Sequence, residues 1–272
     1  MFGAIYGDVI GSYYEIHCTK EYDFPFVNES AFTDDSVLIA AVCKTILNNP
    51  SNISKFEISK RSKEYAAKYR QFYSYFPNAG FGNMFAKWAK SHNSKNNRSY
   101  ANGAAMRVIP IGYAYSTIDQ VLFQAKASAL PTHNHREAIK AAQSVAAAIF
   151  LAKNGASKEE IRNFIERKFK YDLSVSLEAI RDTYVFDSRA SYSVPPAIIA
   201  FLESHEYESA VRSAISLGGD ADTQACIAGG IAEAFYGDIP DNIKRFCNFK
   251  IDSSIRNTVK EFCKLYDIKI NN

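Results

Sequence analysis

The chain has 272 residues, which is long enough to bury a large hydrophobic core. Its 32 basic and 29 acidic residues leave a net charge of +3, which gives no indication of the dense basic face of a dedicated nucleic-acid binder. Because it shows neither a signal peptide nor an apolar run of membrane-spanning length, we expect a cytoplasmic protein that does not contact membranes.

A predicted helix opens the chain with the sequence GAIYGDVIGSYYE, from Gly3 to Glu15. Gly3, Gly7 and Gly11 recur every four residues, so they present a nearly bare stripe that another helix can approach closely. Asp8 and Glu15 are about two turns apart and also share a face. Taken alone, these two acids are typical of an ordinary solvated helix face.

The next predicted helix covers residues 36–48 and follows a polar run of Thr33, Asp34 and Asp35. Thr and Asp are favoured at helix N-caps, and acids in the first turn suit the helix dipole. One cap, however, explains one side chain and not three in succession. The run is therefore a candidate for a function beyond capping.

Helical periodicity continues along the rest of the chain. Amphipathic patterns predict helices over 54–71, 136–153, 174–186, 207–216 and 254–266, and capping-box sequences open others at 117–120 and 157–160. No segment alternates as a strand would, and the polar residues 91–99 form only a surface loop. We therefore expect an all-α fold, with one compact multi-helix domain over residues 1–272, acting as a monomer.

The five cysteines, at positions 18, 43, 226, 247 and 263, form no CxxC pair and are odd in number. Several fall within apolar helical patterns, so we interpret them as reduced thiols of the core. Such thiols are typical of a cytosolic protein.

Two polar stretches precede predicted helices in the middle of the chain. Within residues 98–108, Asn102-Gly103 is a turn signal, and small residues around it allow a ligand to approach the backbone, where helix N-terminal amides attract phosphates. A plain loop-to-helix junction is the alternative. The sequence THNH at 132–135 is more typical of a cap with a surface or substrate-contacting histidine than of a zinc site.

Near the C-terminus, SLGGDADTQACIAGG repeats the chemistry of the first acidic run. Asp220, Asp222 and Thr223 stand at the start of a helix so apolar that it is predicted to be buried. Four carboxylates brought together would repel one another, and a divalent cation would remove that repulsion. Oxygen ligands select Mg²⁺, Mn²⁺ or Ca²⁺ over zinc, and two facing clusters suit two ions roughly 3.5–4 Å apart. The hypothesis requires the two clusters to meet in the fold.

These stretches, in this order, resemble the ADP-ribosylglycohydrolase family, which includes the dinitrogenase-reductase-activating glycohydrolase. The resemblance spans nearly the whole chain and is most specific in FTDDSVLIAAV and SLGGDADTQACIAGGIAEAFYG. It implies an all-α fold with a central dinuclear metal cleft that holds two divalent cations, Mg²⁺ or Mn²⁺. Ala221 stands where the family usually has Thr or Ser, and Ala101 where it has Gly. Neither departure removes an implied metal ligand.

The resemblance also implies roles for individual residues. The implied metal ligands are Thr33, Asp34, Asp35, Asp220, Asp222 and Thr223. Glu15 matches an acid that contacts the ribose, or water at the metal site, and assists the reaction. The implied substrate contacts are Glu15, Ser99, Tyr100, Asn102, Gly103, Ala104, Ala105, His133 and Gly219, several of them in a loop that cradles the phosphates.

The implied activity is hydrolysis of the glycosidic bond between ADP-ribose and a modified protein or small adduct, with release of ADP-ribose. Such a bond breaks through an oxocarbenium-like state. The resemblance assigns the proton transfer to Glu15 or to an aspartate of the metal site, Asp34, Asp35 or Asp222. The alternatives are hydrolysis of an ADP-ribosyl-nucleobase or O-acetyl-ADP-ribose, and a non-catalytic ADP-ribose-binding protein. The presence of all six implied metal ligands favours the enzyme.

Overall fold

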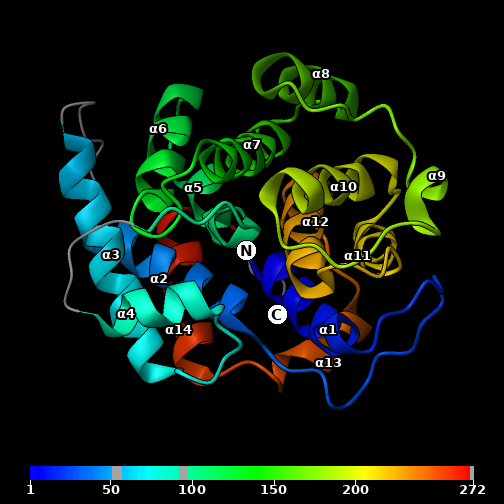
Figure 1. Ribbon diagram of the computed structural model, residues 1–272, viewed down its shortest axis with the longest axis horizontal. Coiled ribbons are helices and arrows are strands. Elements are labelled where there is room, and N and C mark those ends of the chain that lie inside the picture. The colour runs from blue at the N-terminus through cyan, green and yellow to red at the C-terminus, as the bar shows by residue number, and fades with distance from the viewer. Residues whose placement is uncertain (51–56, 92–96, 270–272) are drawn as a thin grey trace.

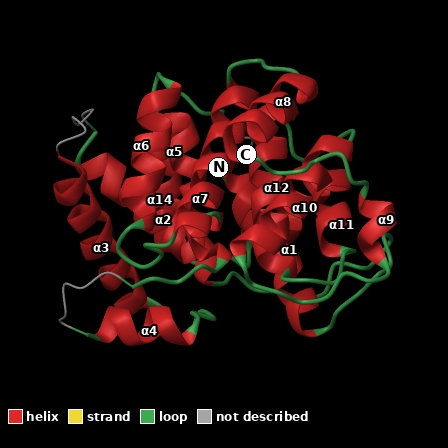
Figure 2. Cartoon of the chain, turned by 45° about the horizontal axis from the view of Figure 1, so that its top comes forward, coloured by secondary structure: helices red, strands yellow, loops and turns green. Residues whose placement is uncertain are grey.

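The computed structural model describes residues 1–50, 57–91 and 97–269. Its helices are α1 Phe2–Ile16, α2 Asp34–Asn48, α3 Ile58–Tyr75, α4 Asn83–Lys90, η2 Asn102–Ala104, η3 Met106–Val108, α5 Ile109–Ala114, α6 Ile118–Ala129, α7 Arg136–Lys153, α8 Lys158–Phe169, α9 Leu177–Arg181, α10 Ala190–Glu203, α11 Tyr207–Ile215, α12 Ala221–Tyr236, α13 Asp241–Asn248 and α14 Ser253–Leu265. Figure 2 shows these helices joined by loops, without a β-sheet in the part of the chain that is described. The predicted all-α class is confirmed.

Helices α1 and α12 lie side by side in the middle of the molecule (Figure 1). A Cβ atom on Gly7 would lie 2.1 Å from the carbonyl oxygen of Ala225, and one on Gly11 would lie 2.5 Å from that of Ala221. Glycine at these positions therefore lets one helix backbone touch the other. The bare stripe predicted for the first helix is confirmed, and α12 is its partner.

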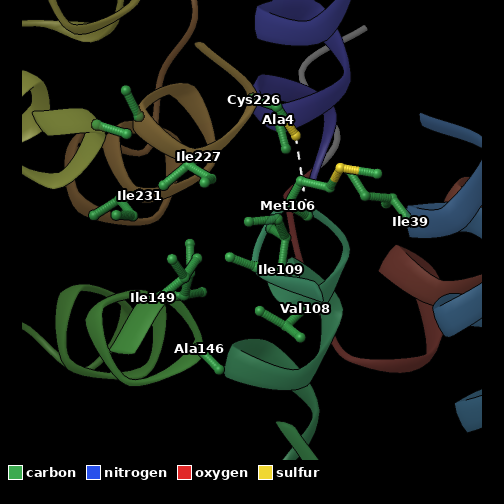
Figure 3. Close-up of a cluster of buried hydrophobic side chains, with 14 of the residues drawn as sticks. Ala4, Ile39, Met106, Val108, Ile109, Ala146, Ile149, Cys226, Ile227 and Ile231 are labelled. Atoms are coloured by element: carbon green, nitrogen blue, oxygen red, sulfur yellow. Dashed lines mark hydrogen bonds between the residues drawn. The ribbon is translucent and has the colours of Figure 1, made fainter. Parts of the chain in front are cut away.

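Helix α12 is buried along most of its length, as its apolar sequence predicts. Helices α7, α10 and α11 pack around it. Figure 3 shows Met106, Ile109, Ile149 and Ile227 converging in the adjoining core, with the thiol of Cys226 directed at the Met106 carbonyl at 3.6 Å. This packing fixes the segment before α5 against the start of α12.

Most other predicted helices occur close to their expected bounds, as α2, α3, α7, α11 and α14. Residues 54–56 of one prediction, and 92–96 of the predicted surface loop, lie outside the described residues. Ser157 and Glu160 form a complete capping box. At Thr117 only the hydroxyl half forms, because Gln120 Oε1 is buried and has no hydrogen-bond partner in the described part of the chain.

The prediction of a helix over 174–186 is wrong for most of its length, since α9 covers only Leu177–Arg181. Just beyond it, the ammonium group of Lys20 donates hydrogen bonds to the backbone carbonyls of Arg181 and Tyr184, each at 2.6 Å. It also binds the carbonyl of Leu217 at 2.6 Å. Carbonyls at a helix end have no partner within the helix. Lys20 binds those at and just after the end of α9 and joins them to the turn before α12.

All five cysteines are free thiols, and four of them are buried as predicted. Cys18 is the exception, because it lies exposed in the loop that follows α1. Within the described ranges, no helix has the length and apolar character needed to cross a bilayer.

Candidate active site

A cavity of about 390 Å³ lies where the starts of α2 and α12 meet the segment that precedes α5. All six residues predicted to bind metal line it, together with the acid at the end of α1. These residues are Glu15, Thr33, Asp34, Asp35, Asp220, Asp222 and Thr223. Two acidic motifs far apart in the sequence therefore meet in one cavity, as the metal hypothesis requires.

Asp8, on α1, fixes the start of α2. Its fully buried carboxylate accepts hydrogen bonds from the backbone N–H groups of Thr33 at 3.0 Å and Ser36 at 3.1 Å. The hydroxyls of the same two residues also donate to it, that of Thr33 at 2.7 Å. Burial raises the pKa of Asp8, and the four hydrogen bonds oppose that rise.

The expectation of a solvated face is therefore wrong for Asp8. A signal was present in the sequence, because the residues around Asp8 are apolar on every side of the helix. A lone acid on such a helix is buried, and a buried carboxylate needs hydrogen-bond donors. The donors, Thr33 and Ser36, come from the far end of the loop that follows α1, so the local sequence pattern does not identify them.

Glu15, Asp220 and Asp222 form the tightest group of acids in the cavity. Each offers an oxygen within 4.8 Å of oxygens of the other two. Gly218 adopts a positive φ of 67° just before the second motif, and this turn brings both aspartates to the cavity. Partial burial, and then the charges of Asp220 and Asp8, raise the pKa of Glu15. Glu15 is not among the predicted metal ligands, but it lies in one group with two of them, Asp220 and Asp222.

Asp34 and Asp35 extend this acidic group on the α2 side. Burial, followed by the charges of neighbouring acids, raises the pKa of Asp34 to about 8. The same causes raise the pKa values of Asp35 and Asp222 well above their ordinary range. Mutual repulsion of this kind is relieved when a cation is bound.

One oxygen of Asp35 supports the same interpretation. Asp35 Oδ2 is buried and has no hydrogen-bond partner among the described residues, although the Cys226 thiol lies beside the carboxylate. Asp35 Oδ1 accepts only a long hydrogen bond of 3.4 Å from Thr223. A buried carboxylate oxygen without a donor, in a site of oxygen ligands alone, fits a hard divalent cation.

The cavity is also lined by four other predicted substrate contacts, Ser99, Asn102, Gly103 and His133. The Asn102 side chain is already engaged inside the protein. Its amide donates to Asp220 Oδ2 at 2.9 Å and to the hydroxyl of Ser193 at 3.0 Å. Asn102 therefore orients a carboxylate of the acidic group.

Four of the predicted substrate contacts do not line the cavity. Ala104 and Ala105 are fully buried, because they belong to the short helical turns that pack into the core. Tyr100 is half exposed on the outer surface of the same loop. Gly219 lies against Tyr184, whose ring would be 2.5 Å from a Cβ at this position, so Gly219 shapes the turn.

Arg107 and Phe186 line the cavity and were not predicted. Arg107 is fully buried and donates to the backbone carbonyl of Ser128 and the hydroxyl of Thr132, both at 2.9 Å. Its position in an apolar run was a signal for a buried charge. Phe186, half exposed at the cavity, lies beyond the end of α9, in the part of the predicted helix over 174–186 that does not form.

Comparisons with known proteins agree with these features. A sequence profile of the ADP-ribosylglycohydrolase family matches residues 1–268. The chain is 26% identical to the ADP-ribosylhydrolase ARH3 of Homo sapiens, over 90% of this chain and 87% of that protein. It is 28% identical to an ADP-ribosylarginine hydrolase of Pseudomonas putida, over 50% of this chain and 38% of that one.

A solved structure described as an ADP-ribosylglycohydrolase-related protein complex shares the fold. Its TM-score is 0.74 at 23% identity, with 99% of this chain and 96% of that chain covered. Because the family profile matches nearly every residue, the chain belongs to the ADP-ribosylglycohydrolase family.

Proposed function

We propose that this protein is a metal-dependent hydrolase that cleaves the glycosidic bond between ADP-ribose and a modified target, releasing ADP-ribose. The target is an ADP-ribosylated protein or a small ADP-ribosyl adduct. The observation that carries this proposal is the convergence of Glu15 and both acidic motifs on one cavity. Relatives named for hydrolysis of ADP-ribosyl bonds add support.

The residues that would hold two divalent cations, Mg²⁺ or Mn²⁺, are Thr33, Asp34, Asp35, Asp220, Asp222 and Thr223. The cations would supply Lewis-acid chemistry and a lowered pKa for water at the site. The protein prepares these side chains for that role. The Thr33 hydroxyl donates to Asp8 and accepts from the backbone N–H of Asp35 at 3.3 Å, which leaves one lone pair of its oxygen available. Asn102 holds one oxygen of Asp220 and leaves the other available.

We assign the proton transfer to Glu15, because it is the exposed member of the acidic group. A carboxylate there would reach a water molecule or a ribose hydroxyl bound in the cavity. Its raised pKa brings it closer to neutral pH, where a group that exchanges protons is most effective. Ser99, Gly103 and His133, which also line the cavity, would contact ADP-ribose.

The test is a panel of ADP-ribose adducts with arginine, serine, nucleobase and acetyl leaving groups, with release of ADP-ribose followed by chromatography. We expect release from at least one adduct. EDTA should abolish it, and Mg²⁺ or Mn²⁺, but not Zn²⁺ alone, should restore it. Asp222→Asn should lose both metal binding and turnover, whereas Asp172→Asn, a surface acid far from the cavity motifs in sequence, should lose neither.

Two outcomes would contradict the proposal. Full turnover in metal-free buffer would remove the cations from the mechanism. If the wild-type protein released nothing from any adduct in Mg²⁺ but bound free ADP-ribose by calorimetry, the protein would be a non-catalytic ADP-ribose binder.

A further inference from the structure

Arg107, Thr132 and His133 form a chain of hydrogen bonds in the wall of the cavity. The buried Arg107 guanidinium lies 4.3 Å over the ring of Tyr69. One of its NH₂ groups uses both hydrogens, one on the carbonyl of Ser128 and one on Thr132 Oγ1, each at 2.9 Å. Thr132 Oγ1 in turn lies 2.7 Å from His133 Nδ1.

The hydroxyl hydrogen of Thr132 decides which nitrogen of His133 is protonated. Arg107 can only donate, so it occupies a lone pair of Thr132 Oγ1. The contacts of the described residues offer the Thr132 hydroxyl no acceptor other than His133 Nδ1. If Nδ1 carried a hydrogen, the hydroxyl hydrogen would remain unbonded in a buried place, which is unfavourable. The network therefore favours Thr132 as donor and a bare Nδ1 as acceptor.

His133 is also held neutral. Burial, and then the charge of Arg107, lowers the pKa of His133 well below its usual range. A neutral imidazole with a bare Nδ1 carries its hydrogen on Nε2. That nitrogen lies beside Gly103, where a Cβ atom would be only 3.2 Å away, and both residues line the cavity.

We propose that Arg107 and Thr132 are positioning residues that fix His133 as the Nε2–H tautomer, so that His133 donates a hydrogen bond to bound ADP-ribose. The identity of the ligand rests on the proposed function. Acceptors of the required kind are the phosphate and ribose oxygens of ADP-ribose. His133 then recognises the ligand and takes no part as a base, which leaves proton transfer to the carboxylates of the acidic group.

The tautomer is measured by ¹⁵N NMR of the histidine rings in the ligand-free protein, with the His133 signals assigned by their loss in His133→Asn. We expect a protonated Nε2 and an unprotonated Nδ1. Thr132→Val, which replaces the hydroxyl by a methyl group of similar shape, should lose this preference and weaken ADP-ribose binding about tenfold. Thr132→Ser, which keeps the hydroxyl, should retain both the tautomer and the affinity measured by calorimetry.

A protonated Nδ1 in the wild-type protein would overturn the proposal whatever the variants do. Unchanged ADP-ribose affinity in Thr132→Val would overturn it as well. Because the tautomer is read without substrate or turnover, failure of every adduct in the hydrolysis panel would reject the proposed enzyme without affecting this measurement.

Discussion

A buried carboxylate that does not line the cavity organises the first acidic motif. Asp8 accepts from both the backbone and the hydroxyls of Thr33 and Ser36, so it sets the position of the residues between them. Hydrogen bonds to charged groups are stronger than neutral ones, and a buried donor that loses its acceptor is destabilising. The geometry of the site therefore depends on a residue that need not touch metal or substrate.

We expect Asp8→Asn to lower the free energy of unfolding by about 3 kcal/mol, because an amide NH₂ would face hydrogen-bond donors. Metal affinity should fall as well, since Thr33 and Asp34 lose their support. Chemical denaturation and metal titration measure the two effects. Asp172→Asn is the matched control, because Asp172 also accepts from a backbone N–H and a hydroxyl, both of Ser174, but at the surface. Equal effects of the two substitutions would disprove the special role of Asp8.

The proposed role of Glu15 has a separate test. Glu15→Gln keeps the size of the side chain but removes the group that exchanges a proton, so turnover should fall by roughly 10²- to 10⁴-fold. Calorimetry should find ADP-ribose affinity close to that of wild type. Glu21→Gln, an exposed acid in the following loop, should change neither quantity. Retained turnover in Glu15→Gln would remove Glu15 from the reaction.

At the scale of single residues, the sequence predicts best where chemistry is concentrated at a helix start. The runs at Asp34 and Asp222 contain more acids than capping requires, and both reach the cavity. The roles of Asp8 and Arg107 could not be predicted in this way, because tertiary packing determines their hydrogen-bond partners. Asn102 is a different case. The sequence shows its Asn-Gly turn motif but not the hydrogen bond that its side chain donates to Asp220.

At the scale of elements, helix α1 carries Asp8 and Glu15, and helix α12 carries the second acidic motif. The spacing of the two helices therefore sets the distances between the acids. Glycine fixes this spacing, because a Cβ atom on Gly7 would overlap the carbonyl of Ala225 at 2.1 Å. Interior packing does not yield easily to an added methyl group.

Gly7→Ala should therefore push α1 and α12 apart and lower the free energy of unfolding by about 3 kcal/mol. Metal affinity should fall in the protein that remains folded, because Glu15 and Asp222 move relative to each other. Gly82→Ala is the control for stability, since a Cβ there meets no atom within 4 Å. If denaturation curves of the Gly7→Ala and wild-type proteins superposed, the close packing would not be what holds the two helices.

Helix α10 shows why some elements could not be predicted. Pro195 and Pro196 lie inside it and remove two backbone donors, which makes its sequence look like a break. The structure compensates through distant residues. The hydroxyl of Tyr184 donates to the carbonyl of Tyr192 at 3.3 Å, replacing a bond that Pro196 cannot make. Hydrophobic periodicity identifies helices that have an amphipathic sequence of their own. Helix α10 could not be identified in this way, because contacts with its neighbours help to satisfy its backbone.

At the scale of the whole molecule, the acidic cavity links stability to pH and to metal. In the metal-free protein, the pKa of Asp34 is about 8, above its ordinary value of 3.8. The folded protein thus holds this proton more tightly than the unfolded chain. The stability that Asp34 contributes is complete below its ordinary pKa and is lost as the pH rises through about 8.

We therefore measure the melting temperature in EDTA as the pH rises from about 5 to about 8.5. We expect it to fall more steeply for wild type than for Asp34→Asn. Comparing the two proteins removes the contribution of groups that titrate equally in both. Mg²⁺ near the upper pH should raise the melting temperature of wild type, and much less that of the variant, which lacks a ligand charge. Parallel pH profiles for the two proteins would show that Asp34 is not the titrating group.

The pairing of α1 with α12 also has a consequence for synthesis on the ribosome. The glycine stripe of α1 is synthesised well before α12, the helix that covers it, which is completed only at Tyr236. Until then this apolar helix lacks its main native partner, and exposed apolar segments of this kind are sites for chaperone binding and aggregation. The acidic site needs Glu15 as well as Asp220 and Asp222, so the nascent protein cannot complete it before the second acidic motif has been synthesised.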